Sequence, residues 1–390
     1  MQNFNPLIRL RYGLIIALLS LLPISASTAT SYHVDTVASG FDHAWGMAFI
    51  PNQRLLLVSE RPGQLKLVNR DSGAVTLISG LPDVHARSQG GLLDIALHPD
   101  YPDQPWLYLS YAVRDGRLGQ STTALGRGIL DLDAGLLRDF EELYRAQPPV
   151  ASNAHYGSRL AFDAQGYVYL TVGDRNSKDF GPQHYSQDIS NDLGAILRLH
   201  ADGRIPVDNP FVDDPEASPA IFSYGHRNPQ GLAFHPQTGE LWENEHGERN
   251  GDEINIIQAG GNYGWPIATY GVSYMTGRPF AVTPPENPNT INPVYYWEPD
   301  HPEGFPPSGL AFYFGEAFPD WQGNLLMGNL RHQYLGRFSV AGHTVEKTER
   351  LLAGRGWRIR DVGVGPDDGL VYVLIDQANA PLVRLRPTSP

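Results

Sequence analysis

One arrangement of apolar and polar residues recurs along the chain from residue 30 onward. In each copy a short apolar strand leads into a turn rich in Pro, Asp or Gly, and a second apolar strand follows. Apolar alternation on both sides of a turn is the pattern of a β-hairpin. The pattern therefore predicts six hairpins, at residues 45–60, 92–113, 158–174, 231–247, 309–330 and 359–376.

The six hairpins need partners, because one hairpin alone cannot bury its apolar face. The copies start at uneven intervals of about 50 to 80 residues, which suits repeats separated by loops of variable length. Radial stacking of such units around a channel buries every face. We therefore expect residues 30–390 to form one all-β domain, a six-bladed β-propeller, with the long insertions between the third and fifth copies building one face. An irregular β-sandwich is the alternative.

The composition agrees with short strands joined by loops. The 390 residues include 41 Gly and 32 Pro, and only 18% of them are charged. Cysteine is absent, which excludes disulfide bonds and thiolate metal sites. The formal net charge of −13 argues against a general nucleic-acid-binding function, because neutralising phosphates needs a basic surface.

Residues 1–29 have the pattern of a secretory signal peptide. Arg9 and Arg11 supply positive charge before an uncharged apolar stretch at 13–22, and small residues at 27–29 offer a cleavage site. A retained membrane anchor is the alternative, but the apolar stretch is shorter than the roughly 20 residues that cross a bilayer. No later part of the sequence resembles a membrane span. We therefore expect a cleaved leader and an exported protein, either periplasmic or secreted.

A histidine and an aspartate flank the third hairpin. His155 comes just before its first strand and Asp174 just after its second strand, and a hairpin brings those two ends together. A carboxylate beside an imidazole fixes the tautomer and raises the basicity, as a general base requires. His155 and Asp174 are therefore candidates for a catalytic pair, and a purely structural histidine is the alternative.

Polar residues at the strand ends of other hairpins could form a cationic pocket. A guanidinium can bind a carboxylate or an oxyanion through two parallel hydrogen bonds. Arg358 and Arg360 are two residues apart and so lie on the same side of a strand. Together with Arg227 they indicate a site for a small polyanionic ligand in an otherwise acidic protein, although a salt bridge between blades would also explain Arg227. The whole set is Gln89, Arg227, Asn228, Arg331, Arg358 and Arg360.

An acidic, glycine-rich segment spans residues 244–266. Its glycines make the backbone irregular and expose carbonyl oxygens. Its crowded carboxylates are those of Glu245, Glu248, Asp252 and Glu253. Carboxylates mixed with carbonyl oxygens are the ligands that calcium prefers. The spacing is not that of an EF-hand, and a solvated acidic loop is the alternative, but the mostly apolar run 254–257 that follows favours a bound ion.

Taken together, these segments resemble the soluble, pyrroloquinoline-quinone-dependent aldose sugar dehydrogenases of the glucose/sorbosone dehydrogenase family. The resemblance covers nearly the whole chain after residue 30. Each motif is weak alone, whereas their order is specific. The motifs are HAWGMAFIP, QGGLLDIALHPD, HYGSRLAFD, SYGHRNPQG, GDEINII, GNYGWP and RIRDVGVGPDDG.

The resemblance implies a role for each candidate residue. His155 matches the general base, and Asp174 matches its carboxylate partner. The positions that hold the quinone are matched by Gln89, Arg227, Asn228, Arg358 and Arg360. A calcium ion that bridges to the quinone would be bound by the backbone carbonyls of Gly247 and Glu248, and a second, structural calcium by Glu253 and the carbonyl of Tyr263.

Two positions depart from the family pattern. Glu248 stands where the family often has Pro, and a backbone-carbonyl ligand can survive that change. Arg331 stands where relatives often carry Lys. The positive charge is kept, but the compact ammonium of lysine is replaced by the planar guanidinium of arginine.

The reaction that the resemblance implies is oxidation of an aldose sugar to a lactone, with an external electron acceptor. In that scheme calcium polarises the quinone carbonyl, His155 takes the proton of the anomeric hydroxyl, and Arg227 stabilises negative charge on the quinone oxygen. Two other functions remain open. One is a propeller that only binds a ligand, and the other is a calcium-dependent lactonase with metal-binding side chains around the central channel.

Overall fold

The computed structural model describes residues 30–116, 119–298 and 304–388. By its internal contacts the chain divides into two units, Met1–Ser31 and Tyr32–Pro390, and the architecture that follows is that of the second unit. The predicted signal peptide, residues 1–29, lies outside the described residues.

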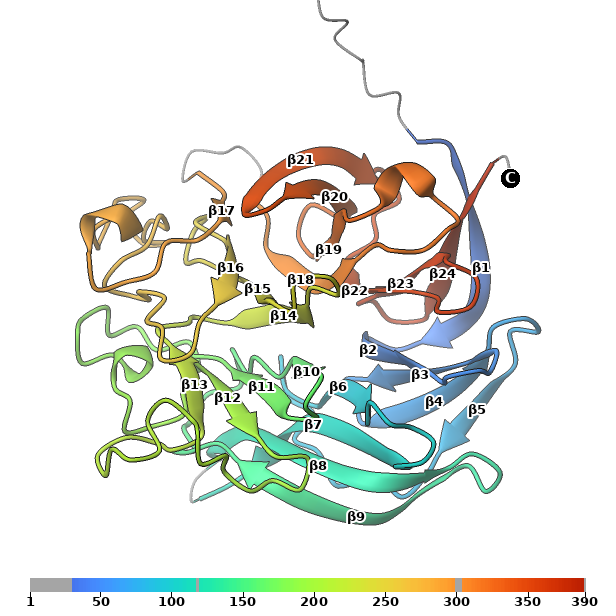
Figure 1. Cartoon of the computed structure of the whole chain (residues 1–390), viewed down its shortest axis with the longest axis horizontal. Helices are drawn as coiled ribbons and strands as arrows, with labels where there is room; N and C mark the ends of the chain where they lie inside the picture. Colours follow the sequence, from blue (N-terminus) through green and yellow to red (C-terminus); the bar gives the residue numbers. More distant parts are fainter. Residues whose placement is uncertain (1–29, 117–118, 299–303, 389–390) are drawn as a thin grey trace, which may run out of the picture. The chain divides into compact units, whose positions relative to one another are not determined.

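Tyr32–Pro390 contains six four-stranded antiparallel sheets arranged in a ring (Figure 1). Each of the six predicted hairpins forms the two inner strands of one sheet. The strands nearest the axis, which pack against one another, are β2, β6, β10, β14, β18 and β22. The expected six-bladed β-propeller is therefore confirmed, and the β-sandwich alternative is wrong.

The strands of the first three blades follow the sequence from the axis outward. The first blade consists of β2 (Ala44–Phe49), β3 (Leu55–Glu60), β4 (Gln64–Asn69) and β5 (Val75–Ile78). The second blade consists of β6 (Leu92–Leu97), β7 (Trp106–Arg114), β8 (Ser121–Asp131) and β9 (Leu136–Arg145). The third blade consists of β10 (Leu160–Phe162), β11 (Val168–Val172), β12 (Ala195–Leu199) and β13 (Ile221–Tyr224).

The fourth and fifth blades repeat this order. The fourth blade consists of β14 (Pro229–Phe234), β15 (Leu241–Glu245), β16 (Glu253–Ile257) and β17 (Tyr295–Tyr296). The fifth blade consists of β18 (Pro307–Phe312), β19 (Leu325–Asn329), β20 (Tyr334–Ala341) and β21 (Thr344–Leu351).

The sixth blade closes the ring with a strand from the other end of the domain. Its first three strands are β22 (Ile359–Val364), β23 (Val371–Ile375) and β24 (Ala380–Pro387). The outermost strand is β1 (Tyr32–Phe41), which pairs antiparallel with β24 and places Tyr32 opposite Pro387. This pairing joins the two ends of the propeller through backbone hydrogen bonds.

Apolar side chains from adjacent blades form the core. Between the first and second blades, one cluster contains Leu57, Leu65, Ile95 and Leu109, which are buried. Alternating positions of a strand point to opposite faces of its sheet. Each blade therefore buries one face against the preceding blade and the other face against the next.

Equivalent positions of the six inner strands are occupied by Gly46, Asp94, Arg159, Gly231, Gly309 and Asp361. Arg159 Nη1 lies 3.1 Å from Asp94 Oδ1 and 3.2 Å from Asp361 Oδ1. The three side chains, called the axial triad below, are buried. A Cβ at Gly309 would collide with Asp361 Oδ1, so the close approach of these blades requires glycine there.

Helical turns are few in the described residues. They comprise three short 3-10 helices, η1 (Tyr185–Gln187), η2 (Pro284–Glu286) and η3 (Pro319–Trp321). No helix in this part of the chain has both the length and the apolar character that a membrane crossing requires.

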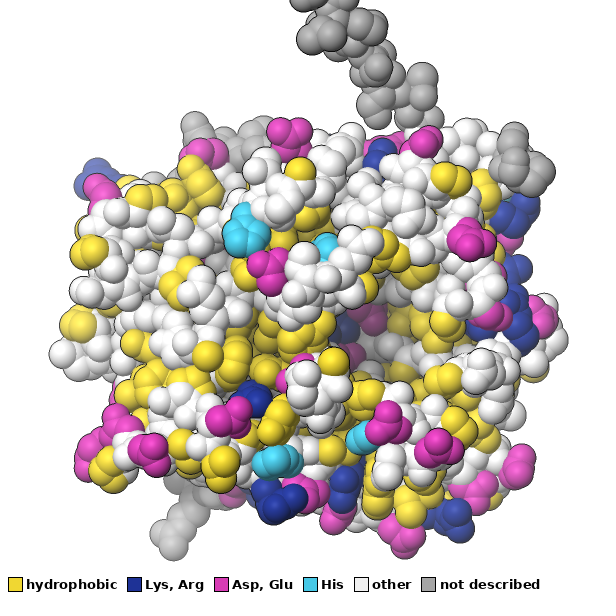
Figure 2. Space-filling model, in the orientation of Figure 1, with side chains coloured by type: hydrophobic (Ala, Val, Ile, Leu, Met, Phe, Trp, Pro, Cys, Tyr) yellow, Lys and Arg dark blue, Asp and Glu magenta, His cyan; other side chains and the backbone are white. Residues whose placement is uncertain are grey.

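Long loops of the third and fourth blades supply many of the residues that line the site described below. Residues 173–194 connect β11 to β12, residues 246–252 connect β15 to β16, and residues 258–294 connect β16 to β17. These segments lie between the third and fifth sequence repeats, where the long insertions were expected. Figure 2 shows a hollow near the centre of one face, with basic and acidic side chains visible inside it.

Candidate active site

The third hairpin brings His155 and Asp174 together. Ser158 donates its backbone N–H to the carbonyl of Thr171 at 2.7 Å, which extends the pairing of β10 and β11 toward the two residues. His155 Nδ1 lies 2.6 Å from Asp174 Oδ1. The imidazole–carboxylate pair expected from the hairpin is thus present.

Asp174 is fully buried and is held on both carboxylate oxygens. Oδ1 also accepts the N–H of Asn176 at 2.7 Å, and Oδ2 accepts the indole N–H of Trp265 at 2.8 Å. Burial works to raise the pKa of Asp174, but the imidazole of His155 and the guanidinium of Arg227 outweigh it and hold the pKa below its ordinary value. Asp174 is therefore an ionised acceptor that fixes the proton of His155 on Nδ1.

His155 presents a neutral imidazole with a free lone pair to a cavity. Burial, then the charge of Arg227, lowers the pKa of His155 below its ordinary value, although Asp174 opposes the shift. The side chain of Gln89 accepts the backbone N–H of His155 at 2.8 Å, and the residue has a φ of 49°. Left-handed backbone at a non-glycine residue is costly and is often found at functional sites. With Nδ1 committed to Asp174, Nε2 can accept a proton from a bound molecule.

The cavity beside His155, called the histidine cavity here, has a volume of about 700 Å³. Its lining includes Arg227 and Glu248 on one side and three apolar side chains, Phe180, Tyr274 and Met275. Tyr274 is 56% exposed and Met275 is 96% exposed. The cavity is thus an open cleft that combines imidazole, guanidinium and ammonium groups with apolar side chains.

Arg227 is fixed in the loop between β13 and β14 by two carboxylates. Glu245 accepts the backbone N–H groups of Arg227 at 2.5 Å and of Asn228 at 3.3 Å. Glu248 Oε2 accepts from the Arg227 guanidinium at 2.7 Å, and the same carboxylate accepts from Lys178 Nζ at 2.9 Å. The guanidinium also lies over the ring of Trp265, 5.1 Å from its centre. Arg227 therefore reaches the cavity in one defined position.

A second cavity, called the arginine cavity here, has a volume of about 220 Å³. Its four arginines are Arg61, Arg331, Arg358 and Arg360. The two cavities adjoin each other, because Gln89, His246 and Pro306 line both of them. The predicted residues Asn228, Arg331, Arg358 and Arg360 line the arginine cavity, and Gln89 stands at the junction.

Three of these arginines lie close to the carboxylate of Asp376. Its carboxylate lies 2.8 Å from Arg360 Nη2, 3.5 Å from Arg358 Nη2 and 3.8 Å from Arg61 Nη1. Burial works to raise the pKa of Asp376, but Arg360 and then Arg61 outweigh it and hold the pKa far below its ordinary value. One carboxylate does not neutralise three guanidinium groups, so the cavity keeps positive charge for an anionic ligand.

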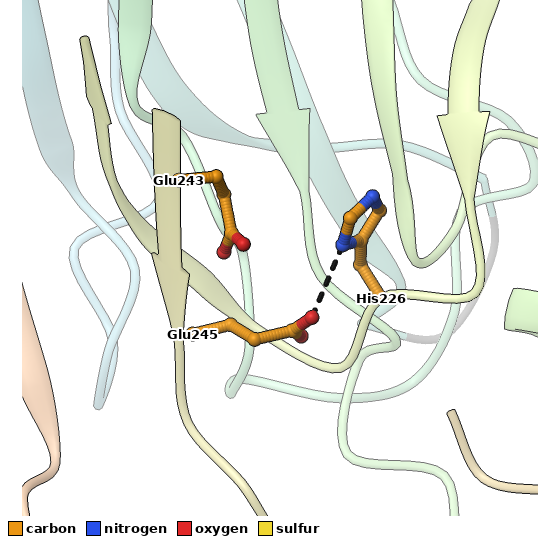
Figure 3. Close-up of side chains that lie close together, drawn as sticks. All are labelled: His226, Glu243 and Glu245. Atoms are coloured by element: carbon orange, nitrogen blue, oxygen red, sulfur yellow. Dashed lines mark hydrogen bonds and ion pairs between the residues drawn. The ribbon is translucent and has the colours of Figure 1, made fainter. Parts of the chain in front are cut away.

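A buried acidic cluster lies on one face of the fourth blade. Glu243 and Glu245 on β15 pair with Asn255 and Glu253 on β16, so the four side chains share that face. Figure 3 shows Glu243 and Glu245 beside His226, whose Nδ1 lies 3.1 Å from Glu245 Oε1. Burial and then the charge of Glu245 raise the pKa of Glu243 and of Glu253 well above their ordinary values.

The acidic cluster has the chemistry of a hard-cation site. Glu243 Oε1 and Asn255 Oδ1 are buried and lack a hydrogen-bond partner among the described residues. Glu245, Glu253, Gly247 and Tyr263 line a small cavity beside it. A calcium ion would satisfy oxygen atoms of this kind and offset the repulsion between the carboxylates. The residues present therefore fit such an ion.

Asp252, another acidic residue of the segment, acts as a backbone clamp. Its carboxylate accepts the N–H of Gly247 at 3.0 Å and the N–H of Phe305 at 3.0 Å. Burial raises the pKa of Asp252 to about 6. The acidic segment is therefore a set of buried contacts, and the alternative of a solvated acidic loop is wrong for Glu245, Glu248, Asp252 and Glu253.

The structure brings the predicted residues to one end of the channel but distributes them over three adjoining cavities. His155, Arg227, Gly247 and Glu248 line the histidine cavity, with Asp174 behind His155, and Glu253 and Tyr263 line the cavity beside the acidic cluster. The salt bridge predicted as an alternative for Arg227 also exists, with Glu248, so the residue has both features.

Sequence reasoning missed several lining residues. His246 donates from Nε2 to the carbonyl of Pro307 at 2.6 Å, and burial lowers its pKa to about 3, so its imidazole is neutral. Its position next to the predicted Gly247 was the available signal. Lys178 and Trp265 belong to loops without the repeat pattern, although Trp265 lies within the quoted GNYGWP motif. Arg61 directly follows β3, a strand end of the same kind as that of Arg331.

The chain is similar to known proteins over most of its length. The family model described as glucose/sorbosone dehydrogenase matches residues 41–384. Aldose sugar dehydrogenase YliI of Escherichia coli (strain K12) is 40% identical over 355 residues, which are 91% of this chain and 93% of that protein.

Solved structures show the same relationship. The soluble aldose sugar dehydrogenase (Asd) from Escherichia coli in the apo-form matches with a TM-score of 0.84 and 39% identity, over 92% of this chain and 100% of that chain. The PQQ-bound form of an aldose sugar dehydrogenase from Streptomyces coelicolor matches with a TM-score of 0.73 and 27% identity, over 92% of this chain and 99% of that chain.

Proposed function

The chain belongs to the glucose/sorbosone dehydrogenase family, and from this membership and the site geometry we propose that it is a quinoprotein that oxidises aldose sugars to lactones with pyrroloquinoline quinone and calcium. The observation that carries the proposal is the junction of two cavities. One holds a neutral imidazole oriented by a carboxylate, and the other holds a group of arginines.

The arginine cavity suits the cofactor because pyrroloquinoline quinone carries three carboxylates. Arg61, Arg331 and Arg358 would bind those carboxylates, with Gln89 and Asn228 as further hydrogen-bonding groups. When bound, the quinone supplies the oxidant that accepts the hydride from the sugar. The chain's own contribution is to bind the cofactor, hold it next to the histidine cavity and exclude other orientations.

His155 performs the proton transfer in this proposal. Nε2 accepts the proton of the sugar's anomeric hydroxyl while the C1–H bond is broken, and the C1–O bond becomes the lactone carbonyl. Asp174 stabilises the resulting imidazolium through Nδ1 without taking the proton, because its own pKa is held low. Arg227, fixed by Glu248, places positive charge beside the reacting groups.

Calcium would bind at two places in this proposal. The carbonyls of Gly247 and Glu248, at the wall of the histidine cavity, would hold an ion next to the cofactor, where it would act as a Lewis acid. Glu253 and the carbonyl of Tyr263 would hold a second ion at the acidic cluster. The unpartnered oxygens and raised pKa values of that cluster support the second ion.

The decisive experiment is reconstitution followed by assay. Purified chain is titrated with pyrroloquinoline quinone, with calcium or with a chelator, and then given aldoses and an artificial dye without nicotinamide. We expect calcium-dependent cofactor binding, dye reduction and lactone formation with several aldoses. If no aldose reduces the dye while the cofactor binds, the proposal gives way to a propeller that only binds a ligand.

A calcium-dependent lactonase is the other function that the same assay tests. Such an enzyme would place metal-binding side chains around the central channel, whereas Asp94 and Asp361 there are ion-paired with Arg159. Lactone hydrolysis by the cofactor-free protein would nevertheless favour it.

We also propose that residues 1–29 direct export and are removed, so that the enzyme works in the periplasm or outside the cell and passes electrons to an external acceptor. N-terminal sequencing of the protein recovered from each cell fraction tests this. A chain that starts at residue 1 in the cytoplasmic fraction would contradict it.

A further inference from the structure

A second imidazole approaches Asp174 at the carboxylate oxygen that does not bind His155. His184 Nε2 lies 3.7 Å from Asp174 Oδ2, and the His184 side chain is completely buried. His184 comes from the loop between β11 and β12, just before η1. Asp174 therefore lies between two imidazoles, one of which faces the histidine cavity.

The hydrogen bonds of His184 fix its tautomer. Nδ1 accepts the backbone N–H of Ser186 at 3.1 Å, which caps the first turn of η1. A nitrogen that accepts carries no proton, so the neutral ring has its proton on Nε2. Nε2 is buried and makes no hydrogen bond of ordinary length among the described residues. This N–H approaches two acceptors, the Asp174 carboxylate at 3.7 Å and the backbone carbonyl of Ser177.

The surroundings of His184 keep it neutral. Burial lowers the pKa of His184 below its ordinary value, which outweighs the opposing effects of Asp174 and Asp179. The ring also packs edge-on against Trp265, with ring centres 6.1 Å apart. Trp265 donates to the same Asp174 oxygen at 2.8 Å. Trp265 is thus hydrogen-bonded to Asp174 Oδ2, and the neutral N–H of His184 lies close to the same oxygen.

We propose that His184 is a positioning residue that acts through Asp174, keeping the proton of the catalytic pair on His155. The inference rests on the proposed role of His155 as the base. A donor at Oδ2 withdraws charge from the carboxylate, which makes Asp174 a weaker acceptor for the proton on His155 Nδ1.

Removing this donor has a predictable sign. Without it, the Asp174 carboxylate carries more negative charge toward His155, which stabilises the imidazolium and makes His155 easier to protonate. The charged or titratable groups that face His155 are Asp174, Arg227, Lys178 and His246. Those that face His184 are Asp174, Asp179 and Arg227. None of these is altered in the experiment below.

Two substitutions separate the two roles of His184, which are to cap η1 and to place an N–H near Asp174. In His184→Asn the amide oxygen replaces Nδ1 and still caps Ser186, because Asn is a preferred N-cap, but the side chain is too short to reach Asp174. In His184→Gln the longer amide can donate to Asp174, but the cap is weakened. The first variant removes the proposed effect with the fold preserved, and the second keeps the effect at some cost in stability.

The test is the titration of His155 by NMR of ring-labelled histidine in the cofactor-free, full-length protein. The resonance of His155 is assigned by its loss in His155→Gln. We expect His184→Asn to raise the titration midpoint of His155 by roughly 0.5–1 unit and His184→Gln to leave it near the parental value. In the reconstituted enzyme, the acidic limb of kcat/KM should move by the same amount.

Two results would overturn the inference. One is an unchanged midpoint in His184→Asn, and the other is an equal shift in both variants, which would trace the effect to the cap. Because the NMR titration needs no turnover, it decides the role of His184 even if no aldose is oxidised. Failure of the aldose assay alone would instead count against the proposed function.

Discussion

We expect Arg159→Met to make the stability of the propeller decrease with rising pH above about pH 6. In the same range the two aspartates that bind Arg159 should leave the stability of the parent unchanged. Arg159 is the only cation of the axial triad, and Asp94 and Asp361 bind it from two other blades. Methionine keeps most of the apolar volume of the side chain but leaves the two buried carboxylates facing each other. The perturbation therefore tests how much this one ion triad contributes to the assembly of the blades.

The magnitude follows from the titration of the two aspartates. Burial raises the pKa of Asp361 to about 6 and also raises the pKa of Asp94, whereas the charge of Arg159 lowers both. In the parent, these two carboxylates bind more protons in the folded chain than in the unfolded chain up to about pH 6, so their contribution to stability falls as pH rises through that range and then levels. Without Arg159 both pKa values rise, and the fall continues above pH 6 at up to about 1.4 kcal/mol per unit for each carboxylate.

The total loss near pH 7 should be about 3–5 kcal/mol, the usual cost of removing one partner from a buried ion pair. An unfolding entropy of about 2.1 cal/mol/K per residue gives about 0.75 kcal/mol/K for a domain of this length. The melting temperature should therefore drop by about 4–7 °C at pH 7 and by less at pH 5.

Thermal melts at several pH values between 5 and 8, with calcium held constant and no cofactor, make the measurement. A control variant combines Arg159→Met with Asp94→Asn and Asp361→Asn. The asparagines can still accept the N–H groups of Leu160 and Met47 that the aspartates bind now, so this control should regain most of the loss and its pH dependence should disappear. Parallel curves for Arg159→Met and the parent from pH 6 to pH 8 would refute the reasoning.

Three further predictions concern the site. His155→Ala should reduce kcat by about 10²–10⁴-fold and leave the cofactor titration nearly unchanged. Asp174→Asn should reduce kcat by a smaller factor, because the base remains. A parental rate in His155→Ala would contradict the mechanism. Activity should fall only as pH drops below the ordinary imidazole value, because burial and a neighbouring guanidinium lower the pKa of His155. Lys178→Met should move that acidic limb up by about 0.2–0.5 unit, whereas an equal shift in Lys347→Met, on the distant β21, would show a nonspecific charge effect. Glu253→Gln should shrink the calcium-dependent rise in melting temperature, and an unchanged rise would remove Glu253 from the site.

The propeller could be predicted from the sequence because its repeat is local. Each inner hairpin is contained in about 20 residues, and its turn residues and apolar alternation are readable without knowledge of the rest of the chain. The closing strand gave no such signal. The pairing of Tyr32 with Pro387 joins residues that are far apart in the sequence, and nothing in the segment 32–41 indicates its partner.

The same division between local and distant contacts holds for the site. His155 and Asp174 could be paired because one hairpin separates them. Two other residues complete the surroundings of Asp174: Trp265 donates to its carboxylate, and His184 lies 3.7 Å from it. Both come from irregular loops whose course depends on packing against other blades. Residues of that kind are found only when the blades are placed around the axis.

The arginine cavity shows why ring closure and ligand binding belong together. Asp376 follows β23 in the sixth blade, where it binds Arg360 of the same blade at 2.8 Å. His43 Nδ1, in the loop that leads into β2 of the first blade, lies 2.7 Å from the same carboxylate, and Arg61, directly after β3 of that blade, lies 3.8 Å from it. One aspartate therefore bridges the first and last blades of the ring at the wall of the cavity. Because the positive charges on this wall come from both sides of that junction, the wall of the cavity is complete only when the first and sixth blades are packed together.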